Sequence, residues 1–187
     1  MTRAQKREQL VETAASLFNR LGYHAAGVDR VIAEAGIAKT TLYRHFGSKE
    51  ALIVAVLQRA DENFREEMRS FVEARTADPR RRLLATFDFI ESWFADRTFY
   101  GCPFMGAAGE YNERTSPVFQ AAALHKRLML AYFEELVRAA GIAEPLRLAA
   151  EINLLHEGAI AVAHIGGDAK AARLAKDIAA RLVLPAA

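Results

Sequence analysis

The sequence has a single cysteine, no long apolar run and no grouping of residues typical of a catalytic site. One cysteine among 187 residues cannot form an internal disulfide, which suits a reducing cytoplasm. No run of about 18 apolar residues occurs, and the opening MTRAQKREQLVE is charged and amphipathic, so we expect neither a membrane span nor a signal peptide. A Cys–His pair, a glycine-rich phosphate loop and paired carboxylates at a cleft are also missing. These absences predict a cytoplasmic protein with no catalytic residue and no cofactor.

Alternating patterns typical of β-strands are absent as well, and helical spacing of apolar residues runs through the chain. Glycine and proline residues interrupt this helical pattern and mark the ends of the helices. The predicted helices span about 10–21, 28–35, 39–46, 48–75, 80–97, 103–112, 117–140, 145–165 and 168–184. The predicted fold class is all-α. We expect a helix-turn-helix domain over residues 1–47, joined by the long helix to a helical effector-binding and dimerisation domain over 48–187.

The segment 27–52, GVDRVIAEAGIAKTTLYRHFGSKEAL, contains two short helices separated by Gly36. Glycine best accepts the left-handed conformation that ends a helix. Two short helices joined by a tight turn form a helix-turn-helix, whose second helix can enter the DNA major groove.

The second of these helices lacks acidic residues. Its expected exposed side chains are hydrogen-bond donors and aromatics: Lys39, Thr40, Thr41, Tyr43, Arg44 and His45. Such groups are suited to phosphates and base edges. Residues 1–50 hold eight Lys/Arg against five Asp/Glu, whereas the rest of the chain holds seventeen against eighteen. Positive charge is therefore concentrated on the predicted DNA-reading segment.

Residues 10–52 resemble the DNA-binding domain of the tetracycline-repressor (TetR) family of bacterial regulators. The matching residues are Phe18, Gly22-Tyr23, Ala35-Gly36-Ile37, Leu42-Tyr43-Arg44-His45-Phe46 and Ser48-Lys49-Glu50-Ala51-Leu52. Gly27 and Ala38 stand where the family usually has a Thr and a Ser cap, and Ile32 replaces a small Ala. The resemblance implies that Tyr43, His45 and Lys49 contact phosphates. We expect Lys39, Thr40, Thr41 and Arg44 to reach base edges or adjacent phosphates.

Eight of the seventeen aromatic residues fall within residues 87–111, which suggests a small-molecule pocket between helices. The predicted lining combines aromatic, apolar and polar side chains: Trp93, Phe104, Met105, Glu110, Tyr111, His125, Tyr132 and His156. A plain hydrophobic core is the alternative. Residues 101–110, GCPFMGAAGE, resemble a motif found in one branch of the family at a helix that moves on ligand binding. Gly106 and Gly109 weaken that helix, which indicates either close backbone approach or easy displacement.

The five histidines do not predict a metal site, because no two of the histidines, and no histidine and the cysteine, have the three- or four-residue spacing usual for zinc. Cys102 has no neighbouring Lys or Arg in sequence and no second thiol, which disfavours a redox sensor.

The last two long helices carry broad apolar faces, one of which is free to pack against a second copy of the chain. The resemblance implies a four-helix bundle across a two-fold axis. The residues predicted at that interface are Ile152, Ala159, Val162, Leu174, Ile178 and Leu182.

The sequence thus predicts a DNA-binding transcriptional regulator. Its expected partners are double-stranded operator DNA, a small-molecule effector and a second copy of itself, with no membrane partner. The alternative is a helical small-molecule-binding protein or enzyme whose helix-turn-helix is not used on DNA.

Overall fold

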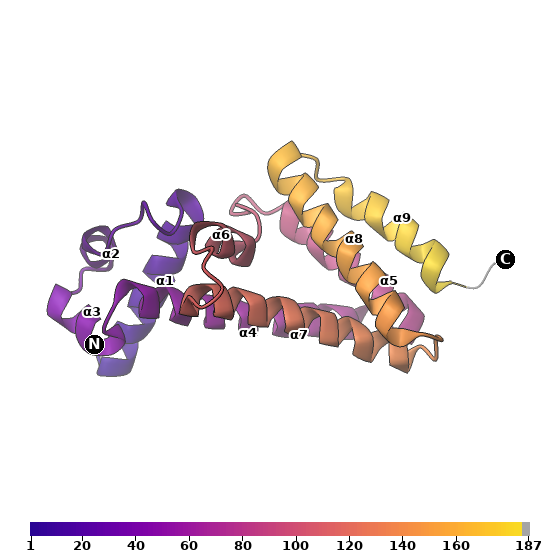
Figure 1. Ribbon diagram of the computed structural model, residues 1–187, viewed down its shortest axis with the longest axis horizontal. Helices are drawn as coiled ribbons and strands as arrows, with labels where there is room; N and C mark the ends of the chain where they lie inside the picture. The colour runs from indigo at the N-terminus through magenta and orange to yellow at the C-terminus, as the bar shows by residue number, and fades with distance from the viewer. Residues whose placement is uncertain (185–187) are drawn as a thin grey trace. The chain divides into compact units, whose positions relative to one another are not determined.

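The computed structural model describes residues 1–184, which form nine α-helices and no strand (Figure 1). The helices are α1 (Arg3–Leu21), α2 (Val28–Ala35), α3 (Lys39–Phe46), α4 (Lys49–Arg75), α5 (Pro79–Phe94), α6 (Pro103–Glu110), α7 (Pro117–Ala139), α8 (Pro145–Gly166) and α9 (Ala171–Val183). The all-α prediction is confirmed. No helix in this range is long and apolar enough to span a bilayer. Residues 185–187, which the predicted second domain includes, lie outside the described residues.

The chain divides into two compact units, and α4 and α7 run through both. The first unit comprises residues 1–62 and 103–125, and the second comprises 63–102 and the chain from 126 onward. Packing thus places α6 and the start of α7 with the helix-turn-helix helices. The predicted domain boundary at residue 48 follows the sequence motif alone and stays a prediction.

The first unit is built around a cluster of buried aliphatic side chains. Leu10 and Leu17 of α1, Leu42 of α3, and Leu52 and Ile53 of α4 are all completely buried. Each such side chain stabilises the fold by about 1.5–3 kcal/mol relative to leaving it exposed. α3 packs on α1 and α2 and buries Leu42, so the second helix of the motif has a defined orientation within the unit.

In the second unit, α5, α8 and α9 pack side by side (Figure 1). Leu83 and Ile90 of α5, Ile152 of α8 and Ala172 of α9 are completely buried at their contacts. α5 is apolar over a wide arc, as its sequence predicts, because other helices cover more than one of its sides.

Local capping explains where the predicted helix boundaries shift. α1 begins seven residues earlier than its apolar stripe, because Thr2 and Gln5 form a capping box. Asp78 caps α5, which ends at Phe94 rather than Arg97. The prediction that Asp168 caps the last helix is wrong: its carboxylate accepts from Lys170 N in a preceding turn, and α9 begins at Ala171.

Candidate nucleic-acid interface

The turn between α2 and α3 is closed by Gly36, whose φ of 63° and ψ of 31° are left-handed. Its N–H donates to Ala33 O at 3.3 Å, and the Ile37 N–H donates to Ile32 O at 3.1 Å. These bonds satisfy carbonyls that the end of α2 would otherwise leave open. α3 can therefore start only three residues after Gly36, which gives the compact geometry of a helix-turn-helix.

α3 presents a polar surface and buries only Leu42. Lys39, Thr40, Tyr43 and Arg44 are exposed, and Thr41 and His45 are partly exposed. Lys39 Nζ lies 2.8 Å from Asp29 Oδ1, and this hydrogen bond and charge raise the pKa of Lys39. Because both side chains are in solvent, the pair is weak and Lys39 can exchange it for a phosphate or base.

Neither helix of the motif has a side-chain N-cap. Gly27 and Ala38 have the extended backbone of N-cap residues but supply no capping hydrogen bond. The two departures from the family pattern thus leave first-turn N–H groups of α2 and α3 without side-chain partners at these positions. A Ser or Thr at such a position is worth about 1 kcal/mol.

His45 lies in a strongly positive environment. Partial desolvation is the main cause of its lowered pKa, and the charges of Arg3, Arg7, Arg44 and Lys6 add to it. Arg7 Cζ also lies 5.4 Å from the centre of the Phe46 ring. The first turns of α1 therefore bring cations to the C-terminal end of α3, which the motif alone did not predict.

Lys49, a predicted phosphate contact, donates from Nζ to His24 O at 3.1 Å. Its partial burial lowers its pKa, and the charge of Glu110 opposes that shift. The first residue of α4 is thereby tied to the loop between α1 and α2. Contact with a phosphate would require Lys49 to leave or share this carbonyl.

The same loop is held by the last residue of α6, in a contact that we call the Glu110 latch. The Glu110 carboxylate accepts from Tyr23 N at 2.7 Å and from His24 N at 2.6 Å. His24 Nε2 and Glu110 O are 2.9 Å apart, and the His24 ring stacks on Tyr111 at 4.6 Å between ring centres. Hydrogen bonds of backbone N–H groups to a carboxylate are stronger than neutral ones.

The start of α6 is attached to the same loop. The Tyr23 hydroxyl donates to Pro103 O at 2.9 Å. Gly22 allows the Glu110 latch to close, since it has a φ of 85° and an added Cβ would lie 2.9 Å from Glu110 Oε1. α6 is therefore bonded at both ends to the loop that precedes the helix-turn-helix.

The predicted effector-contact residues divide between the two compact units. Phe104, Met105, Glu110, Tyr111 and His125 belong to the first unit, and Trp93, Tyr132 and His156 belong to the second. The two carboxylate oxygens of Glu110 accept hydrogen bonds from backbone N–H groups, and its contact with an effector stays a prediction. Met105 is exposed, whereas Phe104 is buried.

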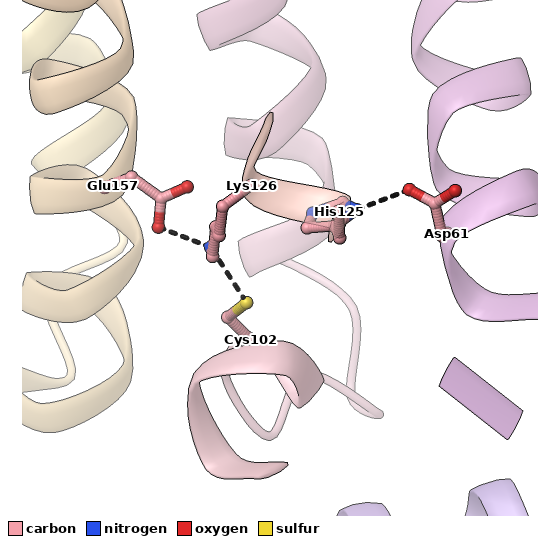
Figure 2. A network of polar contacts seen from close by, with 5 residues as sticks. All are labelled: Asp61, Cys102, His125, Lys126 and Glu157. Carbon is pink, nitrogen blue, oxygen red and sulfur yellow. Dashed lines mark hydrogen bonds and ion pairs between the residues drawn. The ribbon is translucent and has the colours of Figure 1, made fainter. Parts of the chain in front are cut away.

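His125 is buried and paired (Figure 2). Its Nδ1 lies 2.7 Å from Asp61 Oδ1, and its ring stacks on Phe104 with 3.6 Å between ring centres. This arrangement packs α6 on α4 and α7 within the first unit. His125 is thus a polar residue satisfied inside the fold rather than one that points into open space.

The next residue of α7, Lys126, makes the other contacts drawn in Figure 2. Its Nζ donates to Glu157 Oε2 at 2.6 Å and to Cys102 Sγ at 3.4 Å. A cation therefore does lie next to Cys102, although none stands near it in sequence, because α7 supplies it. Among residues 1–184 no three His, Cys, Asp or Glu side chains gather as a metal site would require.

Trp93, Tyr132 and His156 lie in aromatic surroundings within the second unit. Trp93 packs edge-on against Phe64 and Phe99, with ring centres 5.3 and 4.9 Å away. His156 is buried with its ring against Phe87 and Phe133. Arg69 covers the ring of Tyr132, and burial raises the pKa of that phenol. Ring-to-ring contacts of this kind are typical of a packed aromatic core, and here the core also contains the imidazole of His156 and the hydroxyl of Tyr132.

A cleft of about 510 Å³ lies beside the Glu110 latch within the first unit. Its lining is largely polar: His24, Glu50, Glu110, Tyr111, Asn112, Glu113, Thr115, Ser116 and Pro117. Of the predicted effector contacts, only Glu110 and Tyr111 reach it. Its chemistry differs from the predicted aromatic pocket.

The predicted dimerisation residues separate by burial. Val162, Leu174, Ile178 and Leu182 are exposed, as an interface requires. Ile152 and Ala159 are buried within the chain, so they have no surface to offer a second copy and that assignment is corrected. Leu154 and Ile165 of α8, 74% and 84% exposed, were missed. They share a helix face with Val162, since their spacing of eight and three residues returns to one side of a helix.

Family models match most of the chain. Residues 10–56 match the model of bacterial regulatory proteins of the tetR family, and residues 79–179 match the tetracyclin repressor-like C-terminal domain. The second match alone covers more than half of the chain. It includes α5 to α8 and most of α9.

Individual relatives agree with the family models. The chain is 43% identical to the transcriptional activator FasR of Mycolicibacterium smegmatis over 95 residues, which is 49% of this chain and 43% of that protein. It is 28% identical to the transcriptional regulator LmrA of Bacillus subtilis over 86% of this chain and 87% of the relative.

A solved structure extends the similarity to the whole fold. The TetR-family regulator SCO4454 of Streptomyces coelicolor superposes with a TM-score of 0.89 at 27% identity, over 97% of each chain. The polar α3, the turn at Gly36 and the two family matches together lead to one assignment. This chain belongs to the tetR family of bacterial regulatory proteins and is a DNA-binding transcriptional regulator.

Proposed function

We propose that the protein is a cytoplasmic, effector-responsive repressor that binds a near-palindromic operator as a homodimer. The observation that carries this proposal is α3, an exposed helix with donor and aromatic side chains and no acidic residue, which packs on α1 and α2 and buries Leu42. Lys39, Thr40, Thr41 and Arg44 are assigned to base edges or adjacent phosphates, and Tyr43, His45 and Lys49 to phosphates. No catalytic residue and no cofactor are assigned.

The exposed apolar faces of α8 and α9 support the homodimer. Leu154, Val162 and Ile165 on α8, with Leu174 and Ile178 on α9, leave apolar surface in solvent that a second copy would cover. A two-fold dimer demands a near-palindromic site, with its recognition helices about 34–36 Å apart or at a multiple of that spacing.

Effector control is assigned to the second unit and to α6. The aromatic cluster around Trp93 offers apolar surface for a small aromatic or apolar molecule. α6 is bonded through Glu110 and Tyr23 to the loop that leads into the helix-turn-helix. An effector that displaces α6 would therefore disturb the DNA-reading helices. A hundredfold induction requires about 2.7 kcal/mol of preference for the non-binding conformation.

The test is an electrophoretic mobility shift with DNA from upstream of the protein's own gene. The wild type should shift it, and the quadruple alanine variant at positions 39, 40, 41 and 44 should not. A control with alanine at exposed Arg97, Arg127 and Lys170 should shift it as the wild type does. Equal affinity of the quadruple variant and the wild type would refute the assignment of α3.

Effector control has a separate test, because coupling between two sites is reciprocal. Screening small aromatic compounds by quenching of Trp93, the one tryptophan of the chain, identifies a binder. Operator DNA should then weaken that compound's binding by the same factor as the compound weakens DNA binding. An affinity unchanged by operator would exclude induction by that compound.

A further inference from the structure

The first two turns of α1 carry three cations in an unusual place. Arg3, Lys6 and Arg7 follow the Thr2 capping box, which holds this end of the helix in a regular conformation. The first turn contains no acidic residue. The N-terminal end of a helix is the positive end of its dipole, and a cation there costs about 0.3–1 kcal/mol at low salt. Apart from the contact of Arg7 with the Phe46 ring, the charges of these side chains are unfavourably placed for the helix.

The acidic side chains of α1 do not neutralise these cations. Glu8 and Glu12 pair instead with Arg59 of α4. Among the ion pairs described within residues 1–184, none includes Arg3, Lys6 or Arg7. Arg3 and Arg7 are exposed and Lys6 is partly exposed. Three positive charges therefore remain in solvent without a carboxylate partner.

The position of these charges relates them to the DNA-reading helix. The guanidinium of Arg7 lies over Phe46, the last residue of α3, and α1 packs against α3 within the first unit. Arg3, Lys6 and Arg7 all act electrostatically on His45, together with Arg44 of α3 itself. The α1 cations thus continue the positive surface of α3 beyond its C-terminal end.

We infer that Arg3, Lys6 and Arg7 form a second DNA-contact surface, which binds backbone phosphates beside the groove that α3 enters. The inference rests on the DNA-binding function and adds residues outside the helix-turn-helix to it. Phosphates are the matching partner, because long exposed cations provide charge without the fixed geometry that base reading needs. A local arrangement that costs stability is typical of a functional site. These residues are positioning residues, and α3 still reads the bases.

The test compares two charge-matched triple variants in the full-length protein. One is Arg3→Gln/Lys6→Gln/Arg7→Gln, and the control is Arg97→Gln/Arg127→Gln/Lys170→Gln, whose residues are exposed in the second unit. Affinity for the upstream fragment and for a random-sequence duplex of about 30 base pairs, long enough for two half-sites and their flanks, is measured by fluorescence anisotropy at several salt concentrations. Thermal unfolding is followed by circular dichroism.

We expect the α1 variant to bind both duplexes on the order of tenfold more weakly. The slope of log K against log salt should become shallower by about 0.9 for each phosphate that the variant no longer neutralises. The melting temperature should change little, because removing unfavourable charges from the helix end offsets the lost contact of Arg7 with the Phe46 ring. The control variant should match the wild type in affinity and slope.

Three results would overturn the inference. An unchanged slope for the α1 variant would exclude phosphate contacts, and a lowered melting temperature with an unchanged slope would make the role purely structural. A weakening confined to the upstream fragment would assign base contacts instead. If the wild type bound neither duplex, the DNA-binding function itself would be refuted. If the wild type bound both and the α1 variant matched it in affinity and slope, only the inference about α1 would be refuted.

Discussion

Glu110 Oε2 lies 2.6 Å from the backbone nitrogen of His24, although 86 residues separate the two in sequence. This bond and its partner to Tyr23 N join α6 to the loop that precedes the helix-turn-helix. Glu110 therefore connects the end of α6 to the loop that leads into the DNA-reading helices.

Removing the Glu110 carboxylate should loosen this loop. We expect Glu110→Ala to lower the free energy of unfolding by about 2 kcal/mol, because hydrogen bonds to charged groups are worth about 1.5–3 kcal/mol. Denaturant unfolding measures the change. Glu113→Ala, at an exposed acid of the same cleft, is the matched control and should change stability little. Equal stability of both variants would show that the Glu110 latch does not stabilise the fold.

The glycines on either side of the Glu110 latch should respond in opposite ways to alanine. Gly22→Ala should destabilise, because the backbone there has a φ of 85° and a Cβ would crowd the Glu110 carboxylate. Gly109→Ala should stabilise α6 by about 1 kcal/mol, because a Cβ at that position meets nothing within 4 Å. Thermal unfolding of the two variants checks both signs. If Gly109→Ala destabilised, α6 would require a glycine there for contact rather than for easy displacement.

DNA affinity should depend on the protonation of His45. Its pKa lies below the ordinary value of 6.5, so at about pH 7.5 the imidazole is neutral. As pH falls through this lowered pKa, the new positive charge is repelled by Arg3 and Arg7 in the free protein but attracted by phosphates in the complex. Operator affinity should therefore rise as the pH is lowered from about 7.5 to about 5.5. The free energy that neutral His45 contributes to folding is fully present above pH 6.5 and is lost as the pH falls through the lowered pKa.

Anisotropy titrations at both pH values test this dependence on His45. His45→Gln should show a smaller rise in affinity than the wild type, and His164→Gln, at an exposed histidine of α8, should keep the full rise. An identical pH response in the wild type and His45→Gln would contradict a phosphate contact by His45.

The homodimer should depend on the exposed faces of α8 and α9. Val162→Glu combined with Leu174→Glu places charges on those faces and should shift the protein toward the monomer, since buried unpaired charges are costly. Analytical ultracentrifugation should give about twice the 20.7 kDa chain mass for the wild type. Leu124→Glu, on exposed α7 surface, is the control and should remain dimeric. A monomeric wild type at micromolar concentration would exclude the proposed assembly.

Local signals made the helix-turn-helix predictable from sequence. Gly36 and Gly47 end α2 and α3 through backbone conformations that depend on nearby residues only. The Glu110 latch could not be predicted in this way, because its donors are backbone N–H groups, which every residue but proline possesses. The spacing of apolar residues along α8 also could not show that Ile152 faces inward, because apolar residues of α8 itself occupy most of its circumference. The cations of α1 could have been noticed in the sequence, because they lie at the positive end of the helix dipole, where cations are unfavourable.

The most direct test of the account is the ratio of affinities for the upstream operator and a scrambled duplex of equal length and composition. For the wild type, we expect specific binding to be at least about 10³-fold tighter. Arg44→Ala should lower that ratio by about tenfold to a hundredfold, if it reads a guanine, and relax the preference at one base pair. A wild-type ratio near one, or a ratio unaffected by removing the exposed side chains of α3, would contradict sequence reading by this helix.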